Sequence, residues 1–273
     1  MLPPRICSVF AGVFMVFCVT NNDVALALTP PPQAASAGYA HLTFDEEFNR
    51  PPDIGYGSPG HKWNGEWDGY YPSDPSHFPW ANGVLTIIAD ANQGMSLTTQ
   101  YQYAAGPNDL SSGSTYFTYG YFEAHLKCTD WSAFYLFDAQ RRWVYGNAVT
   151  SNPATWTSEI DVIETDPGVP HTAVCTVHKN TGGDGGIPDE QNWPNSATIA
   201  GSTINQWHTY GVLWTPTQVT WYVDNQQVCT APTYLSTRHP MALVLTAHPG
   251  GVGGSPSTVN PPTTTVAWVR VWH

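Results

Sequence analysis

Residues 158–165 read Ser-Glu-Ile-Asp-Val-Ile-Glu-Thr. The whole chain contains seven glutamates, and two of them lie in this stretch with an aspartate between them. The intervening Ile and Val residues favour a β-strand, which places three carboxyl groups on a partly buried surface. Crowding like charges on such a surface is costly. The stretch therefore indicates a functional site on a strand.

The spacing of the three acids predicts a local irregularity in that strand. Side chains alternate between the faces of a strand, so Glu159 and Asp161 share one face and Glu164 lies on the other. A β-bulge at Val162–Ile163 adds one residue and returns Glu164 to the same face. We therefore predict that all three acids line one cleft. The alternatives are a solvated acidic strand edge and a set of calcium ligands.

Two carboxyl groups on one sheet face indicate a particular chemistry. Retaining glycosidases hold two such groups about 5–5.5 Å apart, one as nucleophile and the other as proton donor to the leaving oxygen. The donor must keep its proton near neutral pH, and a nearby negative charge raises its pKa. We predict that the two glutamates perform these roles, while Asp161 orients the nucleophile.

Composition narrows the fold and the partners. Charged residues make up 11% of the 273 residues and aromatic residues 13%, with 24 Gly and 24 Pro, which predicts one ordered, turn-rich β-domain. The net charge of −12 argues against nucleic acid or an anionic membrane as a partner. The 12 Trp and 14 Tyr suit stacking on neutral sugars. We expect a polysaccharide partner and a monomeric protein.

The N-terminus has the pattern of an export signal. Arg5 precedes the apolar run Ile6–Thr20, and Ala25–Ala27 offers a small-x-small cleavage site. We predict a signal peptide over residues 1–27, a flexible leader over 28–39 and a single catalytic domain over 40–273. The predicted location is secreted or periplasmic, with no membrane contact after cleavage. Alternatives are cleavage after Ala37 and an uncleaved anchor, although the run is shorter than the ~20 residues that span a bilayer.

Removal of the signal leaves three cysteines, Cys128, Cys175 and Cys229. An odd number permits at most one internal disulfide, and an export compartment allows a bridge without requiring one. The pairing stays open. The sequence has no C-x-x-C pair, so it does not support zinc or redox chemistry.

Short strand-like runs separated by Gly, Pro, Asn and Asp turns follow one another from residue 40 onward. Many strands in one domain predict a two-sheet sandwich or a closed barrel. The clearest runs are residues 83–89, 116–127, 131–137, 158–165, 172–178, 208–214, 219–223, 240–247 and 264–272.

Several ordered blocks resemble glycoside hydrolase family 16, the laminarinase and endo-β-1,3(1,4)-glucanase group. Together with Glu159–Glu164 (E-I-D-V-I-E), the blocks are FDEEFN (44–49), WNGE (63–66), NGVLTI (82–87), YGYFEAHLK (119–127), WSAFYL (131–136), WHTYGVLW (207–214) and TWYVD (220–224). The resemblance implies an all-β jelly-roll sandwich of two antiparallel sheets with a concave substrate cleft. It implies Glu159 as nucleophile, Glu164 as acid/base and Asp161 as the orienting helper, in agreement with the analysis of the residues.

The implied activity is that of a secreted retaining endo-β-glycanase that acts on a β-1,3- or β-1,3(1,4)-glucan. The E-x-D-x-x-E spacing is more similar to laminarinases than to strict lichenases. Alternatives are another glycan, such as a bacterial exopolysaccharide or a galactan, and a transglycosylase. A more distant alternative is a non-catalytic jelly-roll protein that binds glycans.

Candidate substrate-binding residues flank the acids. We expect Trp131 and Trp156 to stack on sugars, with packing in the core as the alternative. His178 resembles a family histidine near the cleft that binds substrate or tunes Glu164, and the alternative is a packed histidine. No cofactor and no catalytic metal are expected. Ala267 replaces an acid that helps bind a structural calcium in relatives, which leaves calcium only as an alternative.

Overall fold

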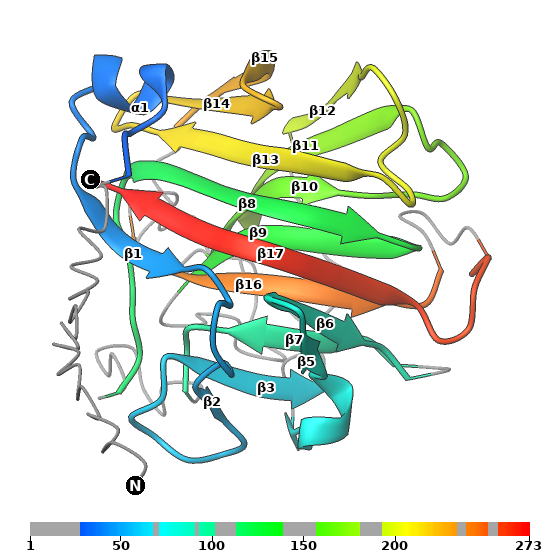
Figure 1. The fold of residues 1–273 in the computed structure, drawn as a ribbon. Coiled ribbons are helices and arrows are strands. Elements are labelled where there is room, and N and C mark those ends of the chain that lie inside the picture. The colour runs from blue at the N-terminus through cyan, green and yellow to red at the C-terminus, as the bar shows by residue number, and fades with distance from the viewer. Residues whose placement is uncertain are drawn as a thin grey trace, which may run out of the picture.

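The computed structural model describes residues 28–67, 71–90, 93–101, 113–138, 157–180, 193–233, 239–250 and 256–273. Within these residues the chain forms two stacked sheets (Figure 1). Sheet A runs β15 (Gln226–Pro232), β14 (Gln218–Val223), β13 (Trp207–Trp214), β8 (Gly120–Cys128), β17 (Thr263–Trp272), β6 (Val84–Ile88) and β5 (Trp80–Ala81), with β1 (Leu42–Glu46) beside β17. Sheet B runs β12 (Trp193–Thr198), β11 (Thr172–Asn180), β10 (Thr157–Glu164), β9 (Trp131–Asp138), β16 (Met241–His248), β7 (Met95–Thr98), β3 (Trp63–Trp67) and β2 (Ile54–Gly55), with β4 (Tyr71–Pro72) beside β3.

This architecture confirms the predicted all-β sandwich. Almost all strand pairs are antiparallel, and the short β2–β3 pair is parallel. Strands distant in sequence lie side by side. In sheet A, β17 lies between β8 and β6, and in sheet B, β16 lies between β9 and β7. Such pairings bring the C-terminal third of the chain into the middle of both sheets.

The nine predicted strand runs all overlap strands of the structure, but their limits differ in places. The run expected to begin at residue 116 becomes β8 only at Gly120, because Tyr119 and Gly120 have φ values of 65° and 122° that interrupt an extended chain. The hairpin between β14 and β15 turns at Asp224 and Asn225, both with positive φ (48° and 62°). This is the backbone required by a tight two-residue turn.

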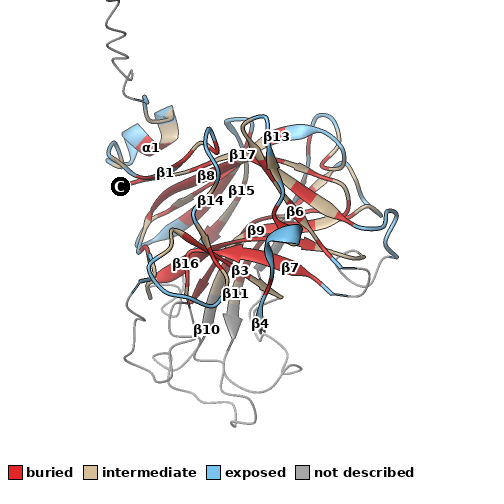
Figure 2. Cartoon of the chain, turned by 60° about the horizontal axis from the view of Figure 1, so that its bottom comes forward, coloured by how far each residue is buried: buried red, intermediate tan, exposed pale blue. Residues whose placement is uncertain are grey.

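The core lies between the sheets, where each strand presents alternate residues. On β9, Phe134 and Leu136 face inward and are fully buried, as are Leu243 and Leu245 on β16. Exposed residues gather in the connecting segments, as Figure 2 shows. The face of sheet B that points away from sheet A takes no part in this packing, so it can carry functional side chains.

The N-terminal segment differs from its prediction. The sequence predicts a flexible leader over residues 28–39, whereas the structure describes a short helix there, α1 (Pro32–Ser36). Ala34 is fully buried against Tyr121 and Trp272 on the outer face of sheet A. Gln33 Nε2 donates to the Tyr121 hydroxyl at 2.7 Å. Burial of one small side chain and this hydrogen bond hold a segment whose Pro- and Ala-rich composition suggested no structure.

The predicted signal over residues 1–27 lies outside the described residues. Within the described part of the chain, no helix combines the length and apolar character needed to cross a membrane.

Strand β10 contains the predicted bulge. Its pairing with β9 and with β11 shifts register after Asp161, and Glu164 resumes the ladder opposite Ala133 and Val174. Val162 and Ile163 are consecutive in sequence and both buried in the core. Trp221 of β14 reaches across from sheet A and donates its indole N–H to the Asp161 carbonyl oxygen at 2.6 Å. A side chain of the opposite sheet thus holds the backbone where the bulge begins.

We predict that this inter-sheet hydrogen bond stabilises the fold. Trp221→Phe removes the donor and leaves a buried carbonyl oxygen poorly satisfied, whereas Trp214→Phe removes an equally buried indole whose N–H has no partner among the described residues. Urea unfolding should show Trp221→Phe to be less stable than Trp214→Phe by about 1–2 kcal/mol. Equal losses in the two variants would contradict the role of the bond.

Candidate active site

The three acids of β10 project from the face of sheet B that points away from the core. Glu159 lies opposite Phe137 of β9 and His178 of β11. Asp161 lies opposite Tyr135 and Thr176 in the same two strands. The bulge adds one residue before Glu164, and this restores the face that the strict alternation of a strand would have changed.

A small cleft of about 100 Å³ lies over these residues. All three acids line it, so the structure brings them together as the spacing predicts. The cleft also receives side chains from β9 and from β16, the next two strands of sheet B on one side of β10. Its lining comprises Trp131, Ala133, Tyr135, Glu159, Asp161, Glu164, Thr246 and His248.

Asp161 is the most enclosed of the three acids, with 2% of its surface exposed. His178 Nε2 lies 2.8 Å from its Oδ2. Asp161 also lies close enough to Glu159 and Glu164 for these contacts to affect the pKa values of Asp161 and Glu164. Burial raises the pKa of Asp161 to about 6, and the charge of Glu164 adds to this effect while His178 opposes it. Asp161 therefore lies at the centre of a cluster that contains His178 and both glutamates.

The environment of Glu164 favours its protonated form. Burial is the main cause of a raised pKa at Glu164, and the negative charge of Glu159 raises it further. His178, Trp131 and Asp161 each act in the opposite direction without reversing the shift. A carboxyl group in this setting keeps a proton at a pH where an exposed glutamate has lost it, as a proton donor requires.

Trp131 forms one wall of the cleft. Its ring packs against His248, with centroids 4.2 Å apart and planes at 57°. Its indole nitrogen is buried and has no partner of normal hydrogen-bond geometry among the described residues, although it lies close enough to Glu164 to lower that pKa. The predicted sugar-stacking role of Trp131 is compatible with this position. Trp156, the second predicted platform, lies outside the described residues.

Four lining residues were not predicted from the sequence: Ala133 and Tyr135 of β9, and Thr246 and His248 of β16. The pairing of β16 with β9 puts Thr246 and His248 opposite Ala133 and Trp131. The run 240–247 signals a buried strand, and no local pattern indicates that it lies beside the strand of Trp131. Alternation along β16 assigns these two residues to the cleft face only once that pairing is known.

One group of described residues has the spacing of a metal site. Ligand atoms of Glu159, Asp161 and His178 all lie within 4.8 Å of one another. The calcium site of relatives is a different case. Ala267 stands in the register shift of β17 between Val266 and Trp268, and its methyl side chain offers no oxygen ligand.

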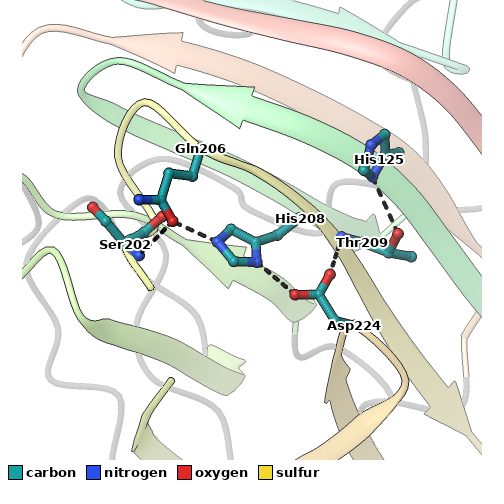
Figure 3. A network of polar contacts seen from close by, with 6 residues as sticks. All are labelled: His125, Ser202, Gln206, His208, Thr209 and Asp224. Carbon is teal, nitrogen blue, oxygen red and sulfur yellow. Dashed lines mark hydrogen bonds and ion pairs between the residues drawn. The ribbon is translucent and has the colours of Figure 1, made fainter. Parts of the chain in front are cut away.

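A second polar network lies on sheet A, whereas the three acids lie on sheet B (Figure 3). His208 Nδ1 lies 2.6 Å from a carboxylate oxygen of Asp224, and Nε2 lies 3.1 Å from the carbonyl oxygen of Ser202. The Ser202 hydroxyl donates elsewhere, to the Ile204 carbonyl oxygen. The serine hydroxyl does not face the histidine as a Ser–His–Asp nucleophile would. The network anchors a turn and a loop to β13.

Comparison with known proteins places this cleft in a family. The family model for "Glycosyl hydrolases family 16" matches residues 74–270. Endo-1,3-1,4-beta-glycanase ExsH of Rhizobium meliloti (strain 1021) is 32% identical over 208 residues, which cover 71% of this chain and 40% of that protein. The chain thus spans less than half the length of this relative.

Solved structures of low sequence identity share the fold. The laminarinase from Rhodothermus marinus superposes with a TM-score of 0.63 at 20% identity, over 85% of this chain and 97% of that one. The GlcNAcα1-4Gal releasing endo-β-galactosidase from Clostridium perfringens superposes with a TM-score of 0.62 at 19% identity, over 85% of this chain and 62% of that one. On its family match and its sequence relatives, the chain belongs to the glycosyl hydrolases of family 16.

Proposed function

We propose that the protein is a retaining endo-β-glycanase that hydrolyses internal linkages of a β-1,3- or β-1,3(1,4)-glucan. The observation that carries this proposal is the bulged strand β10, which presents Glu159, Asp161 and Glu164 together to one cleft. A pair of carboxyl groups with different environments is what the double-displacement mechanism needs.

In the first step Glu159 attacks the anomeric carbon while Glu164 donates its proton to the departing glycosidic oxygen. The burial of Glu164 and the charge of Glu159 support this assignment, because both favour the protonated form of Glu164 before the reaction. The step forms a covalent glycosyl-enzyme and leaves Glu164 ionised.

In the second step Glu164 takes a proton from water, and the resulting hydroxide equivalent attacks the anomeric carbon and releases Glu159. Asp161 orients Glu159 through their contact, and His178 holds Asp161 in place at 2.8 Å. Every transfer in this scheme uses a protein carboxyl group and water. The proposal therefore includes no cofactor.

The substrate and location are also proposals. ExsH is named as an endo-1,3-1,4-beta-glycanase and the Rhodothermus protein as a laminarinase, and both names support a β-linked polysaccharide as the substrate of this chain. Net charge and aromatic content support a neutral polysaccharide. The N-terminal pattern supports export to the periplasm or medium, with no membrane contact after cleavage. We also propose that the protein is a monomer.

We expect the purified protein to release a β-configured reducing end first when it acts on laminarin or mixed-linkage glucan. Anomer-resolved NMR over a panel that also includes galactans and exopolysaccharides measures the substrate and the stereochemistry together. A first product of α configuration would contradict the retaining mechanism. Cleavage of a galactan alone would assign another substrate, and transfer products without hydrolysis would indicate a transglycosylase.

The two glutamate roles predict opposite outcomes of chemical rescue. With an activated aryl glycoside and azide, Glu159→Gly should form an α-glycosyl azide, because azide enters the space of the missing nucleophile. Glu164→Gly should instead form a β-glycosyl azide, because azide attacks the intact glycosyl-enzyme. Without azide, loss of Glu164 should slow cleavage of natural glucan by about 10²–10⁴-fold. The same azide anomer from both folded variants would refute the assignment.

His178 should control the alkaline side of the pH profile. Its charge lowers the pKa of Glu164, so His178→Gln should raise that pKa and keep the acid protonated to higher pH. The alkaline limb of kcat/KM should therefore move to higher pH in the variant. His125→Gln is the matched control, because His125 packs between Trp207 and Trp268 on sheet A. A limb that stays in place or moves to lower pH in His178→Gln would count against this role.

A further inference from the structure

Two of the cysteines face each other across the core. Cys175 lies on β11 of sheet B and Cys229 on β15 of sheet A, with 1% and 4% of their surfaces exposed. Both are free thiols in the structure, and they lie close enough for each to shift the pKa of the other. The third described cysteine, Cys128, is a buried thiol on β8 that contacts Ser132 and Thr165 instead. The fold therefore selects one pair out of three thiols.

The position of this pair gives it a structural role. Cys229 lies opposite Trp221 in the β14–β15 ladder. The indole of Trp221 donates to the Asp161 carbonyl oxygen. Cys175 immediately precedes Thr176, which lies opposite Asp161 in the β10–β11 ladder. The two thiols thus meet beside the hydrogen bond that joins sheet A to the bulged strand.

We propose that Cys175 and Cys229 form a disulfide that joins the two sheets behind β10, while Cys128 remains a thiol. The oxidant is a disulfide, either a small molecule such as oxidised glutathione or the disulfide of an oxidoreductase. One sulfur displaces a thiol from the oxidant to form a mixed disulfide, and the second sulfur then displaces the other thiol. Overall the two cysteines lose two protons and two electrons, and the oxidant disulfide becomes two thiols.

The local chemistry suits this exchange. The nearby Cys175 thiol lowers the pKa of Cys229, because it can donate to the thiolate. The same contact, together with burial, raises the pKa of Cys175, which therefore keeps its proton. Cys229 also lies on the edge strand of sheet A, where the backbone has a neighbouring strand on one side only. The first attack therefore falls to Cys229, during folding or when this edge opens.

The test is a peptide map of the full chain refolded with reduced and oxidised glutathione, then alkylated without reduction. Trypsin separates the three cysteines of the fold, because Lys127, Arg141, Arg142, Lys179 and Arg238 place them in residues 128–141, 143–179 and 180–238. Cys7 and Cys18 of the full chain fall in a separate peptide, which begins after Arg5 and ends no later than Lys62. We expect the second and third peptides to be joined, with a mass lower by two hydrogen atoms than their sum, and Cys128 to be alkylated. Alkylation of all three cysteines, or a bridge that includes Cys128, would overturn the proposal.

The bridge should also raise thermal stability. The oxidised protein should melt about 5–10 °C above the same protein held in dithiothreitol. Cys175→Ala and Cys229→Ala should abolish that difference, while Cys128→Ala should keep it. If either of the first two variants fails to fold, the peptide map of the unaltered chain still decides. An oxidised protein with the bridge and no higher melting temperature would refute the stabilising role.

Discussion

The candidate site depends on one extra residue in β10. Without the bulge, Glu164 would point into the core with Ile160, where an unpaired carboxyl group is strongly disfavoured. With it, two consecutive apolar residues, Val162 and Ile163, both fill the core and Glu164 reaches the cleft. The bulge interrupts the hydrogen bonding of the strand, and Trp221 compensates by donating to the Asp161 carbonyl oxygen. The second sheet is therefore part of the apparatus that positions the acids.

Much of this arrangement could be predicted from the sequence, because one short segment must satisfy two constraints on the direction of its side chains. The apolar residues of β10 must face the core, and the three acids must not, and only an insertion at Val162–Ile163 satisfies both. Apolar runs bounded by turn residues likewise located the central strands, such as β9 and β16, whose residues are almost all buried. These strands are specified locally by burial on at least one face.

Other elements carry too little local signal. Strand β15 begins with exposed glutamines and ends in a proline, as an edge strand can, and its pairing depends on the Asp224–Asn225 turn. Helix α1 forms on a Pro- and Ala-rich segment because Tyr121 and Trp272 bury Ala34 from distant parts of the chain. The presence of His248 in the cleft depends on the pairing of β16 with β9. Such long-range pairing is the part of a fold that local patterns do not encode.

The electrostatics of the cleft follow from the close spacing of three carboxyl groups on β10, the same feature that marks residues 158–165 in the sequence. Three carboxyl groups share one small site, and Asp161 lies between the other two with His178 as its basic neighbour. Full ionisation of all three would place several like charges in a poorly solvated space, so burial and mutual repulsion favour protons on Asp161 and Glu164. Such a cluster titrates as a unit, and loss of a proton from one carboxyl group changes the proton affinity of the others.

In the proposed reaction this coupling changes the protonation state of Glu164 between the two steps. When Glu159 becomes esterified its negative charge disappears, and the charge that raised the pKa of Glu164 disappears with it. Glu164 can then stay ionised as the base that the second step requires, so the same repulsion that favours a proton donor before the first step releases a base after it.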